Sequence, residues 1–349
     1  MKLSNIFLVT CLVTFFFACK NDKETSPSDN TSTNNGADST NVTTNAPTVK
    51  APEFDADAAK LLVKKQVDFG PRVPNTAAHQ ACRKWMVQQL KSYGCTVIEQ
   101  NFTAKSYNGI DLKGTNIIAS INPQASNRIM LAAHWDSRHI ADKDGDATKT
   151  KLPILGADDG GSGVAVLMQL AKTIQNNPIK LGIDFILFDA EDHGDDQGSS
   201  QDSWCLGSQY WAKNPHQQGY RPMYGILLDM VGGVGSKFPV EGFSANYAPQ
   251  VVSKVWGAAM SLGYGDTFLM QRAGTITDDH YYVNTIAGIP MADIIALPPG
   301  TPYGFPSHWH THNDNMSAID AKTLKIVGAT LLQVIYQDDH AMNSTAPLN

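Results

Sequence analysis

The chain has 349 residues, with 33 acidic and 27 basic side chains and a formal net charge of −6. Hydrophobic residues make up 42% of the chain, which is enough to form a core and excludes a wholly disordered protein. The mild acidity argues against a nucleic-acid partner, because nucleic-acid-binding proteins usually present a basic face. No internal apolar run reaches the about 18 residues of a membrane span.

The N-terminus resembles an export signal. An apolar run over residues 6–18 is too short to span a bilayer and suits the hydrophobic region of a signal peptide. It ends at Ala18-Cys19, which resembles a bacterial lipobox, although Phe16 stands where such boxes usually carry Leu. We expect a lipoprotein signal peptide over residues 1–18 and a lipid on Cys19 that anchors the exported chain to a membrane, facing the periplasm or at the cell surface. An ordinary secretory signal with an incidental cysteine is the alternative.

A polar segment separates this signal from the domain. Residues 19–52 are rich in Asn, Thr, Ser and Asp, a composition that cannot offset the entropy of ordering and predicts a disordered tether. A single catalytic domain is expected over residues 53–339, followed by a polar tail over residues 340–349. Three cysteines remain in the domain, and Cys82 with Cys95 is the local pairing for a disulfide; none has the Cys-x-x-Cys spacing of a zinc site.

Apolar runs alternate with amphipathic stretches along the domain. Helical periodicity predicts five helices, over residues 77–93, 163–175, 207–213, 249–262 and 321–336. Short apolar runs predict five strands, over residues 116–121, 129–133, 183–188, 224–228 and 291–297. This alternation of predicted strands and helices predicts an α/β fold of three layers, with a mostly parallel central sheet flanked by helices.

Acidic residues and a histidine directly follow three of the predicted strands. His134 and Asp136 follow the first, the Asp-Ala-Glu-Asp segment of residues 189–192 follows the second, and Asp229 follows the third. In open α/β sheets, ligands bind outside the carboxyl ends of the strands. We therefore expect these side chains to meet at one edge of the sheet.

Further groups of the same chemistry lie elsewhere in the chain: Asp158-Asp159 before a predicted helix, Asp278-Asp279-His280, and His308-Trp309-His310. Each group alone also fits a helix cap, a solvated loop or surface histidines. Together, converging carboxylates repel one another unless a cation or protons are present. Carboxylate and imidazole are natural zinc ligands, and a free acid beside the metal can act as a general base.

These motifs occur in the order found in the zinc exopeptidase superfamily, and the resemblance covers about residues 67–336. The matching segments are Gly156-Ala-Asp-Asp159, Phe188-Asp-Ala-Glu-Asp192, Gly207-Ser208, Leu228-Asp229-Met230, Asp278-Asp279-His280 and Trp309-His310-Thr311. The superfamily contains dizinc aminopeptidases and animal-type glutaminyl-peptide cyclotransferases, the glutaminyl cyclases. The resemblance implies the zinc aminopeptidase-like α/β fold.

Three segments resemble the cyclases more than the aminopeptidases: Phe305-Pro-Ser-His-Trp309-His310, Asp278-Asp279-His280, and Gln201-Asp202-Ser203 before Gly207. The implied activity converts the N-terminal glutamine of peptides or proteins to pyroglutamate and releases ammonia. Two features depart from the animal pattern. Asp192 replaces a glutamate, and the loop over residues 193–201 lacks the tryptophan of the animal pocket, which leaves open whether Trp204 replaces it.

The resemblance also assigns roles to individual residues. One zinc ion would have three protein ligands, namely Asp159, Asp192 and His310. Three acids would be catalytic, namely Glu191, Asp229 and Asp278. Glu191 would move the proton, while Asp278, hydrogen-bonded to Asp229, would hold the leaving amide nitrogen. Two aromatic side chains, Trp309 and Phe305, would pack on the substrate.

Two other functions stay open at this point. A dizinc aminopeptidase would use the same ligands together with His134 and Asp229 for a second zinc ion, and would release free N-terminal residues. A metal-free binding lipoprotein would keep the fold of an enzyme without its chemistry, since fold alone does not imply function.

Overall fold

The computed structural model describes residues 49–198 and 200–344. The expected signal peptide, Cys19 and nearly all of the expected tether lie outside the described residues. The chain divides into two units, over residues 1–47 and 48–349, and all described residues belong to the second. Within the described ranges, no helix has the length and apolar character needed to cross a membrane.

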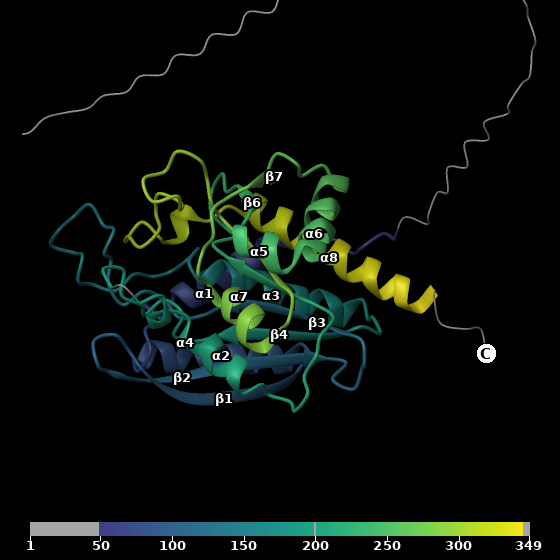
Figure 1. Ribbon diagram of the computed structural model, residues 1–349, viewed down its shortest axis with the longest axis horizontal. Helices are drawn as coiled ribbons and strands as arrows, with labels where there is room; N and C mark the ends of the chain where they lie inside the picture. Colours follow the sequence, from purple (N-terminus) through teal and green to yellow (C-terminus); the bar gives the residue numbers. More distant parts are fainter. Residues whose placement is uncertain (1–48, 199, 345–349) are drawn as a thin grey trace, which may run out of the picture. The chain divides into compact units, whose positions relative to one another are not determined.

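A six-stranded mixed sheet forms the centre of this unit (Figure 1). The strand order is β1-β2-β4-β3-β5-β8, in which β1, β2 and β4 pair antiparallel and the remaining pairs are parallel. The strands are β1 (Thr96–Lys105), β2 (Asp111–Ile121), β3 (Arg128–His134), β4 (Gly182–Phe188), β5 (Gly225–Asp229) and β8 (Met291–Ile295). Two short strands, β6 (Phe238–Val240) and β7 (Phe268–Arg272), pair separately.

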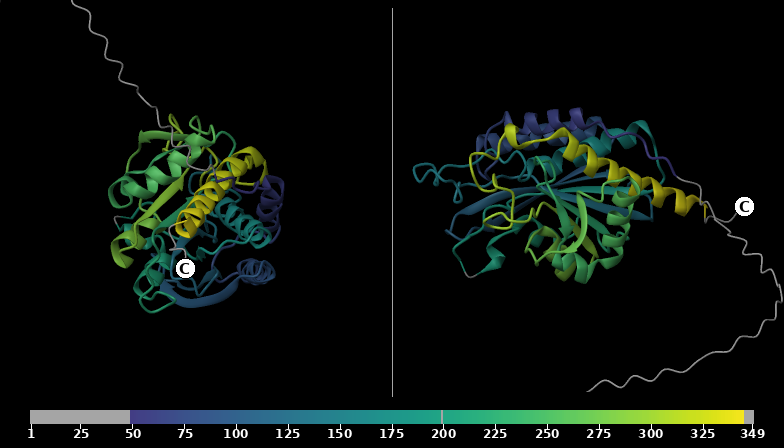
Figure 2. Two further views of the ribbon diagram at one scale, coloured as in Figure 1. Left: turned by 90° about the vertical axis from the view of Figure 1, so that its right-hand side faces the viewer. Right: turned by 90° about the horizontal axis from the view of Figure 1, so that it is seen from above.

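Helices cover both faces of the sheet. They are α1 (Ala56–Val67), α2 (Ala77–Ser92), α3 (Gly161–Asn176), α4 (Leu206–Lys213), α5 (Gly242–Tyr247), α6 (Pro249–Ser261), α7 (Asp279–Tyr282) and α8 (Ala321–Ser344). Helices α1, α3 and α8 contact one another, and Figure 2 shows α1 and α8 on the same side of the sheet. Helices α4 and α7 contact each other and form a separate group.

The side chains of the central strand β3 alternate between two cores. Ile129, Leu131 and Ala133 join the large core under α3, whereas Met130 and Ala132 join a second core with Trp211 of α4. Burial on both faces explains why the central strands are nearly continuous apolar runs. Each large apolar side chain buried in this way contributes about 1.5–3 kcal/mol.

The predicted fold class is confirmed, and all ten predicted segments form elements of the predicted type. The patterns missed α1 and β1, and also the short elements α5, α7, β6 and β7. Strand β1 buries only Phe102 fully, so its side chains lack an apolar period. Helix α8 continues to Ser344, which places a helix in the segment expected to be a polar tail. The sequence left open whether Cys82 and Cys95 form a disulfide; in the structure both are buried free thiols.

Candidate active site

The carboxyl ends of β3, β4 and β5 meet at one edge of the sheet, as the sequence predicts. A cavity of about 350 Å³ opens there. Its acidic lining consists of Asp159, Glu191, Asp192, Asp195, Asp196, Asp229 and Asp278. The other predicted site residues, His310, Trp309 and Phe305, line the same cavity. All eight predicted site residues are therefore brought together.

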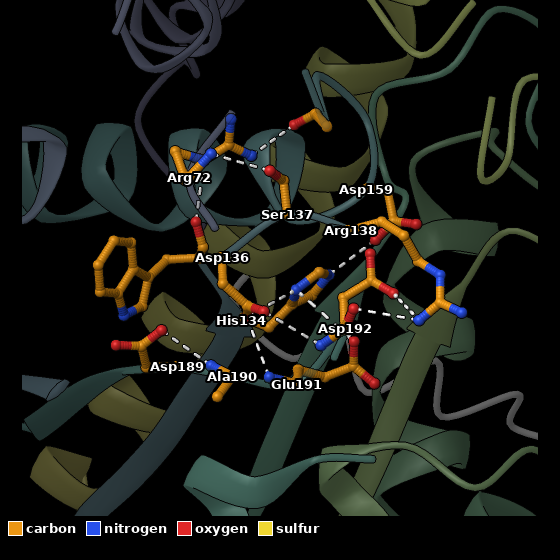
Figure 3. A network of polar contacts seen from close by, with 12 residues as sticks. Arg72, His134, Asp136, Ser137, Arg138, Asp159, Asp189, Ala190, Glu191 and Asp192 are labelled. Atoms are coloured by element: carbon orange, nitrogen blue, oxygen red, sulfur yellow. Dashed lines mark hydrogen bonds and ion pairs between the residues drawn. The ribbon is translucent and has the colours of Figure 1, made fainter. Parts of the chain in front are cut away.

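Asp136, which follows β3, fixes the loop that carries the acid pair. Its carboxylate accepts hydrogen bonds from the backbone N–H groups of Glu191 (3.0 Å) and Asp192 (3.2 Å), as Figure 3 shows. Burial opposes ionisation of Asp136, but its contacts with His134 and these N–H groups lower its pKa. Ala190 turns the chain before the pair with φ of 54°, a strained conformation for a residue with a side chain.

One group of ligand atoms matches the predicted zinc site. Asp159, Asp192 and His310 are buried, and one ligand atom from each lies within 4.8 Å of the others. His310 Nε2 lies 3.2 Å from Asp192 Oδ1 and 3.8 Å from Asp159 Oδ2. Among the described residues, Asp192 Oδ2 is buried without a hydrogen-bond partner. Asp142 Oδ1 lies 3.2 Å from His310 Nδ1, the arrangement that orients zinc-binding histidines. The donor set therefore fits zinc.

A second group lies directly beside the first and shares Asp159. His134 Nε2 lies 3.0 Å from Asp159 Oδ1 and 3.3 Å from Asp229 Oδ1. Burial alone would lower the pKa of His134, but its carboxylate neighbours raise it well above its usual value. The same side chains can therefore form charged hydrogen bonds or hold a second cation.

Glu191 and Asp278 face each other across the site, with ligand atoms within 4.8 Å. Burial raises the pKa of Glu191 well above its usual value, and the charges of Asp278 and Asp192 add to the effect. Asp278 Oδ1 accepts the backbone N–H of Asp279, while Oδ2 has no hydrogen-bond partner among the described residues.

The expected hydrogen bond between Asp278 and Asp229 is absent from the described contacts. The reason is geometric: Asp229 Oδ1 turns to His134, at 3.3 Å. Asp278 instead lies next to Asp293 of β8, with ligand atoms within 4.8 Å. Burial and the charges of Asp278 and Asp229 raise the pKa of Asp293 well above its usual value.

Aromatic rings form a further part of the cavity wall, called here the aromatic wall. The rings of Phe305 and Trp309 lie 4.5 Å apart, and Trp309 stacks on His310 at 3.7 Å. Trp204 also lines the cavity, and its ring is nearly parallel to that of His310 at a centroid distance of 6.0 Å. The guanidinium group of Arg138 lies 4.5 Å from the Trp204 ring. A tryptophan outside the 193–201 loop thus contributes to this wall.

Residues 116–335 match the model of peptidase family M28. The chain belongs to peptidase family M28. It is 50% identical to Bacteroides thetaiotaomicron glutaminyl cyclase bound to N-acetylhistamine, a match with a TM-score of 0.81 that covers 82% of this chain and 99% of that one. It is also 50% identical to a leucine aminopeptidase precursor from Bacteroides thetaiotaomicron VPI-5482, with a TM-score of 0.80 and the same coverage.

A glutaminyl-peptide cyclotransferase of Drosophila melanogaster is 27% identical over 300 residues, which cover 78% of each chain. The resemblance drawn from the motifs is confirmed at the level of the family. M28 proteins are zinc-dependent exopeptidases and their relatives, and the buried histidine and aspartate groups are the metal-site candidates of this member.

Sequence reasoning gave no site role to several residues that shape this M28 site. Arg138 donates to the backbone oxygens of Asp192 (3.2 Å) and Gly194 (3.0 Å). The Asp314 carboxylate accepts the backbone N–H groups of Asp158 (2.7 Å) and Asp159 (3.2 Å). Arg138 and Asp314 make these contacts with backbone atoms, and the spacing of residues in the sequence does not indicate such contacts. Asp136 had a signal, because it follows a strand beside His134.

Proposed function

We propose that this M28 chain is a glutaminyl-peptide cyclotransferase that uses one zinc ion and converts N-terminal glutamine of peptides and proteins to pyroglutamate. One observation carries the proposal: Asp278 Oδ2 is a buried acceptor without a partner among the described residues, on the cavity wall next to Glu191. The similarity to a bacterial glutaminyl cyclase over most of both chains supports the same function.

The cavity suits the substrate in size and polarity. Its volume of about 350 Å³ lies at the small end of ligand pockets and matches one terminal residue rather than a long peptide. A primary amide has two N–H donors, which complement the free oxygen of Asp278. The rings of Trp309 and Phe305 would pack on the aliphatic part of the glutamine side chain.

The reaction closes a five-membered lactam within one residue. Glu191 would accept a proton from the α-amine, whose nitrogen bonds to the γ-carbonyl carbon. The bond from that carbon to the amide nitrogen breaks, and Glu191 returns the proton so that ammonia leaves. Asp278 would hold the departing nitrogen, with Asp229 beside it. Because the attack is intramolecular, orientation by the aromatic wall supplies much of the acceleration.

Asp159, Asp192 and His310 would hold the zinc ion, which when bound supplies Lewis-acid polarisation of the γ-carbonyl group. The buried and unpartnered Asp192 Oδ2 supports this ligand set.

The test is a product analysis. The protein without residues 1–18 is incubated with a short peptide that begins with glutamine, and the products are followed by mass spectrometry. We expect loss of one ammonia with the peptide chain intact, and no product from the Glu191→Gln variant. Release of free glutamine would refute the cyclotransferase. If no product forms in the presence of zinc, the hypothesis of an enzymatic function would be refuted, and a binding protein would be favoured.

A dizinc aminopeptidase is the second candidate, since one similar structure is a leucine aminopeptidase precursor. The group of His134, Asp159 and Asp229 favours it, because these atoms lie at the distances that a second ion requires. The metal content of the purified protein separates the two. About one equivalent of zinc supports the cyclotransferase, whereas two equivalents with release of terminal residues support the aminopeptidase.

We also propose that Cys19 carries a lipid and anchors the exported enzyme to a membrane. The apolar run that ends in Ala18-Cys19, and the polar segment after it, support this proposal. The full chain, expressed in a bacterium with labelled palmitate, should be labelled and should fractionate with membranes. The Cys19→Ala variant should lose both properties; membrane fractionation of the wild type without label would refute lipidation.

A further inference from the structure

We infer that Cys205 is a positioning residue for the general base, because its thiol donates a hydrogen bond that holds the Glu191 carboxylate toward the cavity. The inference rests on the proposed function, in which Glu191 moves the proton. Cys205 itself does not line the cavity, so it would act only through Glu191.

The contact between the two side chains is direct. Cys205 Sγ lies 3.3 Å from Glu191 Oε1, and the thiol is fully buried. This contact joins the carboxylate to the start of α4. The nearest imidazole nitrogen, His134 Nδ1, lies 3.8 Å from Glu191 Oε2. The thiol is therefore closer to the carboxylate than this imidazole is, and it favours one orientation of the base.

The backbone places the thiol there. The N–H of Cys205 donates to the carbonyl of Glu191 (2.9 Å), and the N–H of Leu206 donates to the carbonyl of Ala190 (3.0 Å). These bonds join the start of α4 to the loop of the acid pair. Gly207 permits the approach, because a Cβ at that position would lie 2.2 Å from the carbonyl oxygen of Asp189.

Cys205 also adopts an unfavourable conformation at this junction. Its φ of 56° lies in the left-handed region, where a residue with a side chain is strained. An asparagine or glycine would take this conformation at lower cost. A strained, buried cysteine whose thiol contacts the base points to a role for the side chain beyond filling space.

The chemistry of a thiol suits this role. Burial raises the pKa of Cys205 well above its usual value, and the charge of Glu191 adds to the effect, so the thiol stays protonated and can donate. Sulfur is a weak donor. Since strong hydrogen bonds to a carboxylate reduce its basicity, a weak donor orients the base while leaving it able to accept a proton.

The experiment compares Cys205→Ala with the conservative Cys205→Ser, which keeps a donor. We expect Cys205→Ala to lower kcat about fivefold, the loss that corresponds to one ordinary hydrogen bond, with KM and zinc content unchanged. Cys205→Ser keeps the carboxylate in place but is a stronger donor that lowers its basicity, so kcat should fall by about twofold, less than in Cys205→Ala. Cys95→Ala, which removes another buried free thiol outside the cavity, is the matched control and should leave kcat unchanged.

Crystal structures of both Cys205 variants give a readout that does not depend on the reaction. The Glu191 carboxylate should move or take several conformations in Cys205→Ala and keep its place in Cys205→Ser. An unmoved carboxylate in Cys205→Ala, or equal kcat losses in the two variants, would overturn the inference. If the wild type does not cyclise glutamine, the proposed function fails, and these structures still decide whether Cys205 positions Glu191.

Discussion

The Asp136→Asn substitution tests whether the acid pair owes its position to one side chain. Asp136 uses one oxygen for the N–H of Glu191 and the other for the N–H of Asp192. Asparagine has the same shape but only one acceptor oxygen. Its amide nitrogen would face one of these N–H groups, donor against donor, and the loop of the acid pair would shift.

The size of the effect follows from the bonds lost. A hydrogen bond to a charged acceptor contributes about 1.5–3 kcal/mol. At about 1.36 kcal/mol for each factor of ten in rate, the loss of one such bond at the base corresponds to a decrease of about 10- to 150-fold in kcat/KM. The substitution leaves the core untouched, so most of the effect should appear in catalysis.

Asp184→Asn is the matched control, because it is an isosteric change of another buried aspartate in β4, away from the cavity. Asp184 accepts four hydrogen bonds, two from Arg128 and one each from Ser120 and Tyr220. Removing its charge leaves Arg128 without its ionic partner and should cost about 3 kcal/mol of unfolding free energy. We expect kcat/KM of the folded Asp184→Asn protein to equal that of the wild type.

The assays are steady-state cyclisation of a glutamine peptide and urea unfolding, with zinc content measured for every variant. Asp136→Asn should lose activity with a small change in stability, and Asp184→Asn should do the reverse. A value of kcat/KM within twofold of the wild type in Asp136→Asn would refute the argument. An equal loss of stability in both variants would show that Asp136 supports the fold rather than the site.

The remaining predictions concern the aromatic wall, the metal, the substrate charge and pH. Trp309→Ala should raise KM about tenfold and Trp309→Phe much less, as steady-state kinetics would show. Chelation should abolish activity, and titration with zinc should restore it at about one equivalent. A peptide with an acetylated N-terminal glutamine should not be converted, because its α-nitrogen is an amide and no longer a nucleophile. Added salt should lower kcat/KM for the free peptide, since the cavity lining is acidic and salt screens its attraction for the terminal ammonium group. Burial raises the pKa of Asp184, but its bonds to Arg128, Ser120 and Tyr220 lower it overall. Its stabilisation is therefore present above the unfolded pKa of about 3.9 and is lost as pH falls through the lower folded pKa, so urea unfolding of the wild type and Asp184→Asn should converge in acid.

Several of the site residues that sequence reasoning predicted share one property, because they follow buried parallel strands. His134, the acid pair and Asp229 each come directly after an apolar run, and parallel strands bring such positions to one edge. Asp159, a proposed metal ligand, precedes helix α3, and His310 belongs to a motif that only the family resemblance identified. Position relative to strands, together with motif order, was therefore sufficient to predict the residues that line the cavity.

The interactions that surround these cavity-lining residues could not be predicted, because they depend on distances between segments far apart in the chain. Asp293 lies within the buried strand β8, where the sequence shows only a polar residue in an apolar run. The partner of Asp229 depends on the rotamer of His134, which no spacing encodes. Trp204 contributes to the cavity wall because of the 3₁₀ turn over residues 201–203 and the start of α4, and local sequence does not determine that orientation.

The cavity contains more carboxylates than one zinc ion would neutralise, and this excess bears on which substrates the cavity would bind. Seven acidic side chains line the cavity, and its lining within the described residues contains no lysine or arginine. Zinc would offset the charge at Asp159 and Asp192, and a protonated His134 would offset the charge near Asp229. The charge at Glu191 and Asp278 then remains for a cation that arrives with the substrate. The α-ammonium group of a free peptide terminus is such a cation. An acid-rich cavity therefore favours a substrate with a free N-terminus before any specificity for glutamine is considered.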